Sequence, residues 1–217
     1  MRLLLPSVPT PLFNGVLVES EPCSGIADSL LEVEERGLRC GLQVRAGRHT
    51  EVEEEAAELG LTARVAMPGM VVSPEGLTDV RTPGLEIVCV DDERGLAAAA
   101  EVAAAGGAPL EFTQALFAPG LLRLDGFAVY LGRSDSVTVT AAIGYRTNND
   151  VGIFNVATPP AHRRRGYGSA ITAHAARAGF ENGADLAWLQ TSEIGEPVYR
   201  GLGFRHVEMH FLLARPA

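Results

Sequence analysis

Apolar and polar residues follow one another with two different periods in the first third of the chain. Between residues 25 and 36, Ile26, Leu30 and Val33 recur at helical spacing with acidic residues between them, which predicts a helix that ends at Gly37. The segments around it have the shorter period of strands. The predicted order is β-α-β-α-β, and these elements lie at 13–19, 25–36, 39–45, 50–59 and 61–72. We expect Pro68-Gly69 to break the last of these strands.

The pattern restarts after a turn-rich stretch at 73–84. It predicts a strand, two helices that follow one another, and three strands joined by the turn-forming clusters 133–136 and 147–150. A helix, a strand, a short helix and a closing strand follow. These elements lie at 85–90, 91–105, 109–117, 127–131, 137–145, 151–156, 166–179, 185–190, 196–201 and 204–213. The fold class is therefore α/β, with a mostly antiparallel central sheet flanked by helices.

The two ends of the chain share a pattern. Residues 13–72 and the last third both contain a strand, a helix, a strand and an acidic short helix, followed by Leu-Gly before the next strand. The two Leu-Gly pairs are Leu59-Gly60 and Leu202-Gly203. One interpretation is an internal repeat, in which a trimmed copy precedes a full copy. The other is ordinary α/β alternation, which produces such similarities by chance.

Charge is distributed unevenly along a chain of otherwise ordinary globular composition. Of the 217 residues, 47% are hydrophobic and 21% are charged, and the net charge is −9. Residues 1–119 hold 19 acids and 8 arginines, whereas residues 120–217 hold 8 acids and 10 arginines; the chain has no lysine. The acidic first half argues against a general nucleic-acid binder, which needs broad phosphate neutralisation. The second half could still hold one small anionic ligand.

Cysteine usage and hydropathy indicate a compartment. Cys23, Cys40 and Cys89 are odd in number and form no CxxC pair, which favours a reducing compartment over a disulfide framework or a zinc site. The apolar run at residues 3–5 is too short for the core of a signal peptide, and no run of about 18 apolar residues occurs. We therefore expect a cytoplasmic protein that binds neither a membrane nor a metal.

The segment from Thr158 to Ala170 carries the clearest chemistry. It follows a predicted strand and opens a predicted helix, and Gly166 and Gly168 let the backbone approach a ligand closely. The amides of a first helical turn lack partners within the helix and attract anions, and the arginines at 163–165 add positive charge. A diphosphate is the expected ligand. A Walker loop would need a lysine, and a Rossmann fingerprint would need glycine at Ile171.

The spacing of Arg163, Gly166 and Gly168 resembles the acetyl-CoA pyrophosphate loop of the GNAT acetyltransferase superfamily. The segment from Tyr199 to Phe204 is similar to the Tyr-x-x-Leu-Gly-Phe segment of that superfamily. The resemblance covers about residues 85–213. It implies a GNAT acyl-CoA N-acyltransferase fold, with a catalytic domain over 81–217. Residues 1–80 would form a truncated GNAT-like lobe without a cofactor.

The same resemblance implies roles for individual residues. Tyr199 would be the general acid that protonates the departing CoA thiolate. Ser192 stands where the superfamily often has an asparagine that contacts pantetheine. The residues expected to bind acetyl-CoA are Asn155, Val156, Ala157, Thr158, Arg163, Arg164, Arg165, Gly166, Tyr167, Gly168, Ser169 and Ser192. No general base stands out, and its candidates by location are His162, Asp150, Glu193 and Glu196.

The activity implied is transfer of an acetyl group from acetyl-CoA to a primary amine by direct attack, with a small molecule or a peptide as the acceptor. The alternative is a non-catalytic protein with the same fold that senses acyl-CoA or serves a structural role. The acceptor-side loops, expected at 109–119 and 147–150, carry no readable code for the amine. The chain ends soon after its last predicted strand, which leaves an edge that either a homodimer partner or the first lobe would cover.

Overall fold

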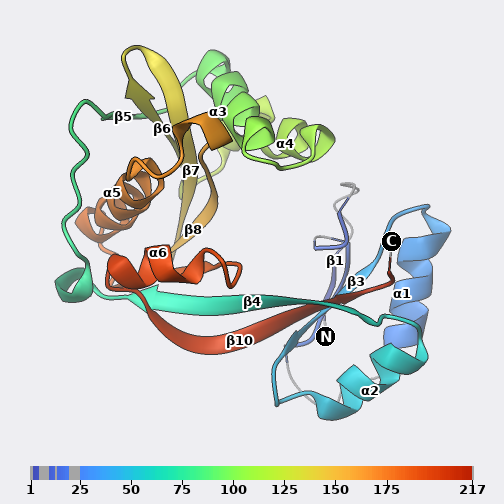
Figure 1. Cartoon of the computed structure of the whole chain (residues 1–217). Coiled ribbons are helices and arrows are strands. Elements are labelled where there is room, and N and C mark those ends of the chain that lie inside the picture. Colours follow the sequence, from blue (N-terminus) through green and yellow to red (C-terminus); the bar gives the residue numbers. More distant parts are fainter. Residues whose placement is uncertain (1, 5–9, 13, 20–24, 217) are drawn as a thin grey trace. The chain divides into compact units, whose positions relative to one another are not determined.

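The computed structural model describes residues 2–4, 10–12, 14–19 and 25–216, and the chain folds into two compact units (Figure 1). Unit 1 comprises residues 1–69, 191–193 and 207–217, and unit 2 comprises residues 70–190 and 194–206. Phe13 and Cys23, on which two of the expectations above depend, lie outside the described residues. The division into domains at residue 80 stays a prediction, because these units are defined by contacts rather than by descent.

Unit 1 has the predicted alternation of strands and helices. Its elements are β1 (Arg2–Leu4), β2 (Gly15–Leu17), α1 (Ile26–Glu35), β3 (Gly41–Arg45), α2 (Thr50–Glu58), most of β4 (Ala63–Val72) and most of β10 (Arg205–Ala214). Strands β2 and β3 are parallel and are connected through α1, whereas β1 pairs with β2 and β10 pairs with β3 in antiparallel fashion. Strand β3 therefore covers the edge that we expected to be open at the last strand. Ile26, Leu30 and Val33 lie buried on one face of α1, as their spacing predicts.

Strand β4 does not break where we expected. It continues through Pro68-Gly69 as one strand from Ala63 to Val72. The carbonyl oxygen of Pro68 accepts a hydrogen bond from the amide of Thr191 at 3.0 Å, so this residue stays paired through its acceptor although it has no N–H to donate. Gly69 lies close to Glu208, to which a side chain at this position would come within 3.2 Å. Here glycine permits close approach of two backbones rather than a turn.

Unit 2 contains the meander and the second β-α-β-α arrangement that the pattern predicts. Its elements are η1 (Pro74–Gly76), β5 (Glu86–Cys89), α3 (Glu93–Ala105), α4 (Leu110–Leu116), η2 (Pro119–Arg123), β6 (Phe127–Ser134), β7 (Val137–Thr147), β8 (Asp150–Ala157), η3 (Pro160–His162), α5 (Tyr167–Glu181), β9 (Leu186–Gln190) and α6 (Glu196–Gly201). The strand order is β4-β9-β8-β7-β6-β5. Strands β5 to β8 are antiparallel neighbours, and β8 and β9 are parallel.

The central strands of unit 2 are buried on both faces. Along β6, Val129 and Leu131 pack in a cluster with α3, and Tyr130 between them packs in a cluster with α5. Along β7, Ala141 and Ile143 alternate with Ala142 in the same way. Because helices cover both faces, these strands appear in the sequence as continuous apolar runs rather than as alternating ones.

None of the helices in the described ranges is long and apolar enough to cross a membrane.

Glycine ends five of the helices by the same device. The residue after the helix cap is a glycine with positive φ, and its amide and the next amide both bond back to carbonyls of the last turn, which is a Schellman motif. These glycines follow α1, α2, α3, α5 and α6, and they are Gly37, Gly60, Gly107, Gly183 and Gly203. The predicted ends at Gly37 and Gly60 and at Gly106-Gly107 are thus confirmed.

The predicted end of α5 at Gly179 is wrong. The helix continues to Glu181, and Gly183 supplies the left-handed residue that ends it. Gly179 instead lies buried inside the helix, where a Cβ atom would overlap the side chain of Val151 on β8. The glycine therefore sets how closely α5 packs on the sheet. Sequence spacing cannot distinguish this role from a helix stop.

We expect Gly203→Ala to destabilise the protein far more than Gly183→Ala. Both glycines have φ of 90°, so alanine at either position costs about 1–2 kcal/mol of left-handed strain. A Cβ at Gly203 would also overlap the carbonyl oxygen of Gly76, whereas one at Gly183 would meet nothing within 4 Å. The overlap should bring the loss at Gly203 to about 3 kcal/mol or more. Urea unfolding followed by circular dichroism measures both, and equal losses would contradict this account.

Candidate functional site

Strands β8 and β9 part in the middle of the unit 2 sheet. Their pairing covers Asp150 to Gly152 on β8 and ends opposite Trp188, although β8 continues to Ala157. At the point of parting, the rings of Phe154 and Trp188 pack edge to face with centroids 5.1 Å apart. Gly152 makes room for both rings, because a Cβ there would lie 2.6 Å from Phe154 and 2.8 Å from Trp188. The far end of β8 is thereby open on the side of β9.

A β-bulge directs this open end of β8. Phe154 pairs with Ile143 and Ala157 pairs with Ala141, so two residues of β8, Asn155 and Val156, lie opposite one residue of β7. Asn155 has φ of 48°, a left-handed conformation that few residues other than glycine adopt within a strand. Beyond the bulge, the hydroxyl of Thr140 donates to the carbonyl of Ala157 at 2.8 Å and fixes the strand end.

The N-terminus of α5 lies at the end of the loop that follows β8. Gly166 is the N-cap residue of the helix, with φ of 80°, and no side chain caps this end of the helix. The first-turn amides at Tyr167, Gly168 and Ser169 therefore have no partner within the helix, which is the arrangement expected for an anion site. The buried Tyr167 donates its hydroxyl to Oγ of Ser134 at 3.3 Å and ties this turn to the end of β6.

The three consecutive arginines differ in their contacts. Arg163 donates from Nε to the carbonyl of Thr158 and from Nη2 to the carbonyl of Gly106, both at 2.9 Å, so it links the loop to the end of α3. Arg164 is exposed and has φ of 61°. Arg165 is also exposed, and no hydrogen bond or ion pair of its side chain occurs among the described residues. Positive charge is thus free for a ligand mainly at 164 and 165.

These elements enclose a cavity of about 620 Å³. Ten of the residues expected to bind acetyl-CoA line it, and they are Asn155, Val156, Ala157, Thr158, Arg163, Arg164, Gly166, Tyr167, Gly168 and Ser169. Arg165 and Ser192 are not among the lining residues, and Ser192 belongs to unit 1. The structure therefore places the end of β8 and the loop that follows it on one cavity, as expected for residues that bind a single ligand. The ligand that these residues hold stays a prediction.

Sequence reasoning missed two further walls of this cavity. The end of α3 contributes Ala103, Gly106 and Ala108, and the start of α6 contributes Ile194, Gly195 and Val198. Ile194 is 92% exposed and Val198 is 44% exposed, which is unusual for aliphatic side chains that lie together on one cavity. The end of α3 lies about 50 residues from the motif, and its Gly106-Gly107 pair predicted only the end of a helix. Ile194 gave no signal at all.

Tyr199 lies next to this cavity in the sequence but does not line it. Its ring is half-buried and packs edge to face against Phe204, with centroids 6.1 Å apart. Burial raises the pKa of the Tyr199 phenol above its usual value of 10. The hydroxyl therefore stays protonated at neutral pH.

Of the four candidate bases, only His162 lines the cavity. Its Nδ1 atom is buried and has no hydrogen-bond partner in the described part of the chain. Glu196 is engaged elsewhere, because its carboxylate lies 2.6 Å from Arg200 and 3.4 Å from His206. Across residues 2–4, 10–12, 14–19 and 25–216, no group of three or more His, Cys, Asp or Glu residues could hold a metal ion.

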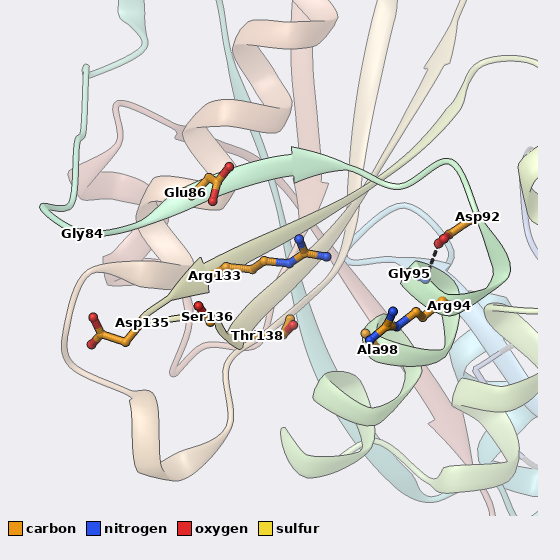
Figure 2. Close-up of a pocket in the computed structure, with 10 residues that line it drawn as sticks. All are labelled: Gly84, Glu86, Asp92, Arg94, Gly95, Ala98, Arg133, Asp135, Ser136 and Thr138. Atoms are coloured by element: carbon orange, nitrogen blue, oxygen red, sulfur yellow. Dashed lines mark hydrogen bonds between the residues drawn. The ribbon is translucent and has the colours of Figure 1, made fainter.

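A second cavity of about 610 Å³ lies beside β5, the β6–β7 turn and the start of α3 (Figure 2). Figure 2 shows the guanidinium groups of Arg94 and Arg133 extending toward one another, with Glu86 and Asp135 directed elsewhere. Asp92 caps α3, accepting a hydrogen bond from the amide of Gly95 at 2.7 Å. None of the predicted site residues lines this cavity, so we place the candidate site in the cavity beside β8.

Comparisons with known proteins agree on one family. Residues 133–207 match the family model described as an acetyltransferase (GNAT) domain. No curated protein sequence matches the chain. Over residues 133–207 the chain therefore matches a GNAT acetyltransferase domain, and the resemblance stated above is confirmed for this part of the chain.

Solved structures agree with this assignment at the level of the fold. A GCN5-related N-acetyltransferase from Kribbella flavida is similar, with a TM-score of 0.70, 22% identity, and coverage of 94% of this chain and 79% of that chain. A conserved protein of unknown function from Staphylococcus epidermidis gives a TM-score of 0.73 at 16% identity, over 99% and 90% of the two chains. An aminoglycoside N-acetyltransferase in complex with CoA gives 0.50 at 20% identity, over 61% and 94%. The predicted fold class is thus confirmed.

We expect Arg163→Ala to destabilise the protein by about 1 kcal/mol, because it removes two hydrogen bonds from a charged group to backbone carbonyls. Arg165→Ala is the matched control, since it makes the same change two residues away at a side chain without such bonds. It should alter the free energy of unfolding by less than about 0.5 kcal/mol. Urea unfolding compares the two, and equal effects would show that the link to α3 adds no stability.

Proposed function

We propose that this protein is an N-acetyltransferase that transfers the acetyl group of acetyl-CoA to a primary amine. One observation carries the proposal: the open end of β8, the N-terminus of α5 and Arg164 line a single cavity. CoA has a diphosphate at one end of a long, largely neutral pantetheine arm. The α5 amides and Arg164 suit the diphosphate, and the strand backbone beside Ile194 and Val198 suits the arm. A solved structure with this fold, an aminoglycoside N-acetyltransferase, contains CoA.

The proposed reaction needs little more than alignment of two reactants. The amine lone pair attacks the thioester carbon, and backbone amides at the β8 bulge near Val156 stabilise the developing oxyanion. The carbon–sulfur bond then breaks, and the thiolate takes a proton from the Tyr199 hydroxyl. His162 accepts the proton that the amine loses, directly or through water, because this histidine is the candidate base that lines the cavity. The second arginine-containing cavity has no part in this scheme.

The charge of the chain bears on the choice of the amine acceptor. The net charge of −9 and the acidic first half favour cationic amines through long-range attraction. We propose a small-molecule or peptide amine as the acceptor, in a cytoplasmic protein that uses acetyl-CoA as a co-substrate and needs no metal.

The first test is binding and turnover of acetyl-CoA. Calorimetry should show saturable binding, and thiol release should appear with at least one member of a panel of amino acids, polyamines, aminoglycosides and peptides. Arg164→Gln should weaken acetyl-CoA binding about tenfold, or about 1.4 kcal/mol, and should leave binding of S-acetylpantetheine unchanged because that compound lacks the diphosphate.

The control is Arg146→Gln, which removes the same charge at a position on β7. Arg146 pairs with Val151, near the start of β8, whereas the cavity lies at the far end of β8. It should leave both affinities unchanged. Binding without thiol release from any amine would favour the alternative function, a sensor of acyl-CoA. Absence of binding would contradict both.

Tyr199→Phe tests the acid. The ring and its packing on Phe204 remain, so the affinity for acetyl-CoA should not change, whereas kcat should fall at least tenfold. The acid works in its protonated form. Because burial raises the pKa of Tyr199 above 10, the wild-type rate should fall only above about pH 10, and the variant should lack this fall. A loss of kcat smaller than tenfold would exclude Tyr199 as the acid.

A further inference from the structure

Two arginines converge on the second cavity, and neither of them pairs with an acid. Arg94 comes from the first turn of α3 and Arg133 comes from the end of β6, and their guanidinium groups extend toward one another (Figure 2). Both residues are exposed and line the 610 Å³ cavity. Within the described ranges, neither side chain has an ion pair or a hydrogen bond. Two like charges that face one another repel, so the folded chain gains nothing from this arrangement by itself.

Acidic partners are available to these arginines and are not used. Glu86 lies directly opposite Arg133 in the antiparallel pairing of β5 with β6, a position where opposite charges normally attract. The Glu86 carboxylate is nevertheless directed elsewhere (Figure 2). Asp92 serves the start of α3, where it accepts the hydrogen bond from the amide of Gly95 at 2.7 Å. The chain has 27 acids and 18 arginines, so a shortage of acids does not explain the unpaired guanidinium groups.

The cavity has room and further donors for a ligand. One turn after Arg94 on α3 stands Ala98, whose small side chain lines the cavity and offers the guanidinium no partner. Ser136 and Thr138 line the same cavity and bring hydroxyl groups to it. Its volume of about 610 Å³ is typical of small-molecule sites, which span about 300–1,000 Å³. There is therefore space for an organic group beside an anion.

We propose that this cavity binds a phosphate group, free or carried by a small molecule, and that Arg94 and Arg133 hold it between them. Two guanidinium groups balance the two negative charges of a phosphate monoester, and each can donate two parallel hydrogen bonds to its oxygens. A phosphate also has more acceptor oxygens than a carboxylate, which suits donors that come from a helix, a strand and a turn. The cavity shares no lining residue with the one beside β8, and the inference does not rest on the proposed function.

Inorganic phosphate, glycerol 3-phosphate and glycerol test the site in NMR spectra of the isotope-labelled protein. The amides of Gly95 and Ser136 report on this cavity, and those of Gly168 and Ser169 report on the cavity beside β8. At constant ionic strength, both phosphates should shift the Gly95 and Ser136 signals saturably, whereas glycerol should not. A lower Kd for the ester identifies a phosphorylated small molecule as the ligand, and an equal or higher one identifies the free ion.

Removal of either guanidinium group should weaken binding without harming the fold. Arg94→Gln and Arg133→Gln should each raise the Kd for phosphate about tenfold, because each removes one set of charge-assisted hydrogen bonds. Without phosphate, both variants should unfold at the wild-type temperature or above it, since these side chains have no bonds to lose. Phosphate should raise the melting temperature of the wild type more than that of either variant.

Arg205→Gln is the control. It removes the same charge from an exposed position of unit 2 that lines neither cavity, and it should leave the Kd for phosphate unchanged.

Three results would overturn the inference. The first is the lack of a saturable shift at Gly95 and Ser136, including the case in which phosphate shifts only the signals of the cavity beside β8. The second is wild-type affinity for phosphate in either arginine variant. The third is binding of acetate as tight as that of phosphate, which would make the cavity a carboxylate site. Failure to bind acetyl-CoA would contradict the proposed function and leave this inference standing.

Discussion

The two-for-one bulge on β8 is the constraint from which the candidate site follows. A strand with regular pairing would continue beside β7 and bring its backbone groups into the ladder. Because Asn155 and Val156 share one partner on β7, the strand bends while β9 has already ended its pairing at Trp188. The Thr140 hydroxyl then holds Ala157 in place. The cavity, the loop and the start of α5 take their positions from this bend.

Most of the fold could be predicted from the chain because its local signals agree with its tertiary structure. Apolar spacing located α1, and left-handed glycines ended α1 and α2 where expected, since only a residue without Cβ fits that position cheaply. The errors arose where glycine or proline had a tertiary role. Gly179 accommodates Val151, and Pro68-Gly69 continues β4, and no local pattern reveals which neighbour will approach.

The candidate site divides in the same way. Contiguous residues such as those from Gly166 to Ser169 could be predicted, because one loop and one helix turn place them together. The end of α3 reaches the same cavity only through the packing of distant elements, and Arg163 bonds to Gly106 there. In the sequence, all three arginines are sources of positive charge, and only the spacing to the glycines distinguishes Arg163 from the other two. In the structure all three arginines are exposed, but Arg163 hydrogen-bonds to two other segments, whereas Arg164 and Arg165 have no hydrogen bond or ion pair of their side chains among the described residues.

Ile194 and Val198 have a thermodynamic consequence. Both are aliphatic side chains on the wall of the cavity, and they are 92% and 44% exposed. Water that covers them is released when a ligand fills the cavity, and loss of hydrated apolar surface lowers the heat capacity of the system. The binding enthalpy should therefore become steadily more favourable as temperature rises. Two exposed side chains that lie outside the core thus make the enthalpy of ligand binding at this cavity depend on temperature.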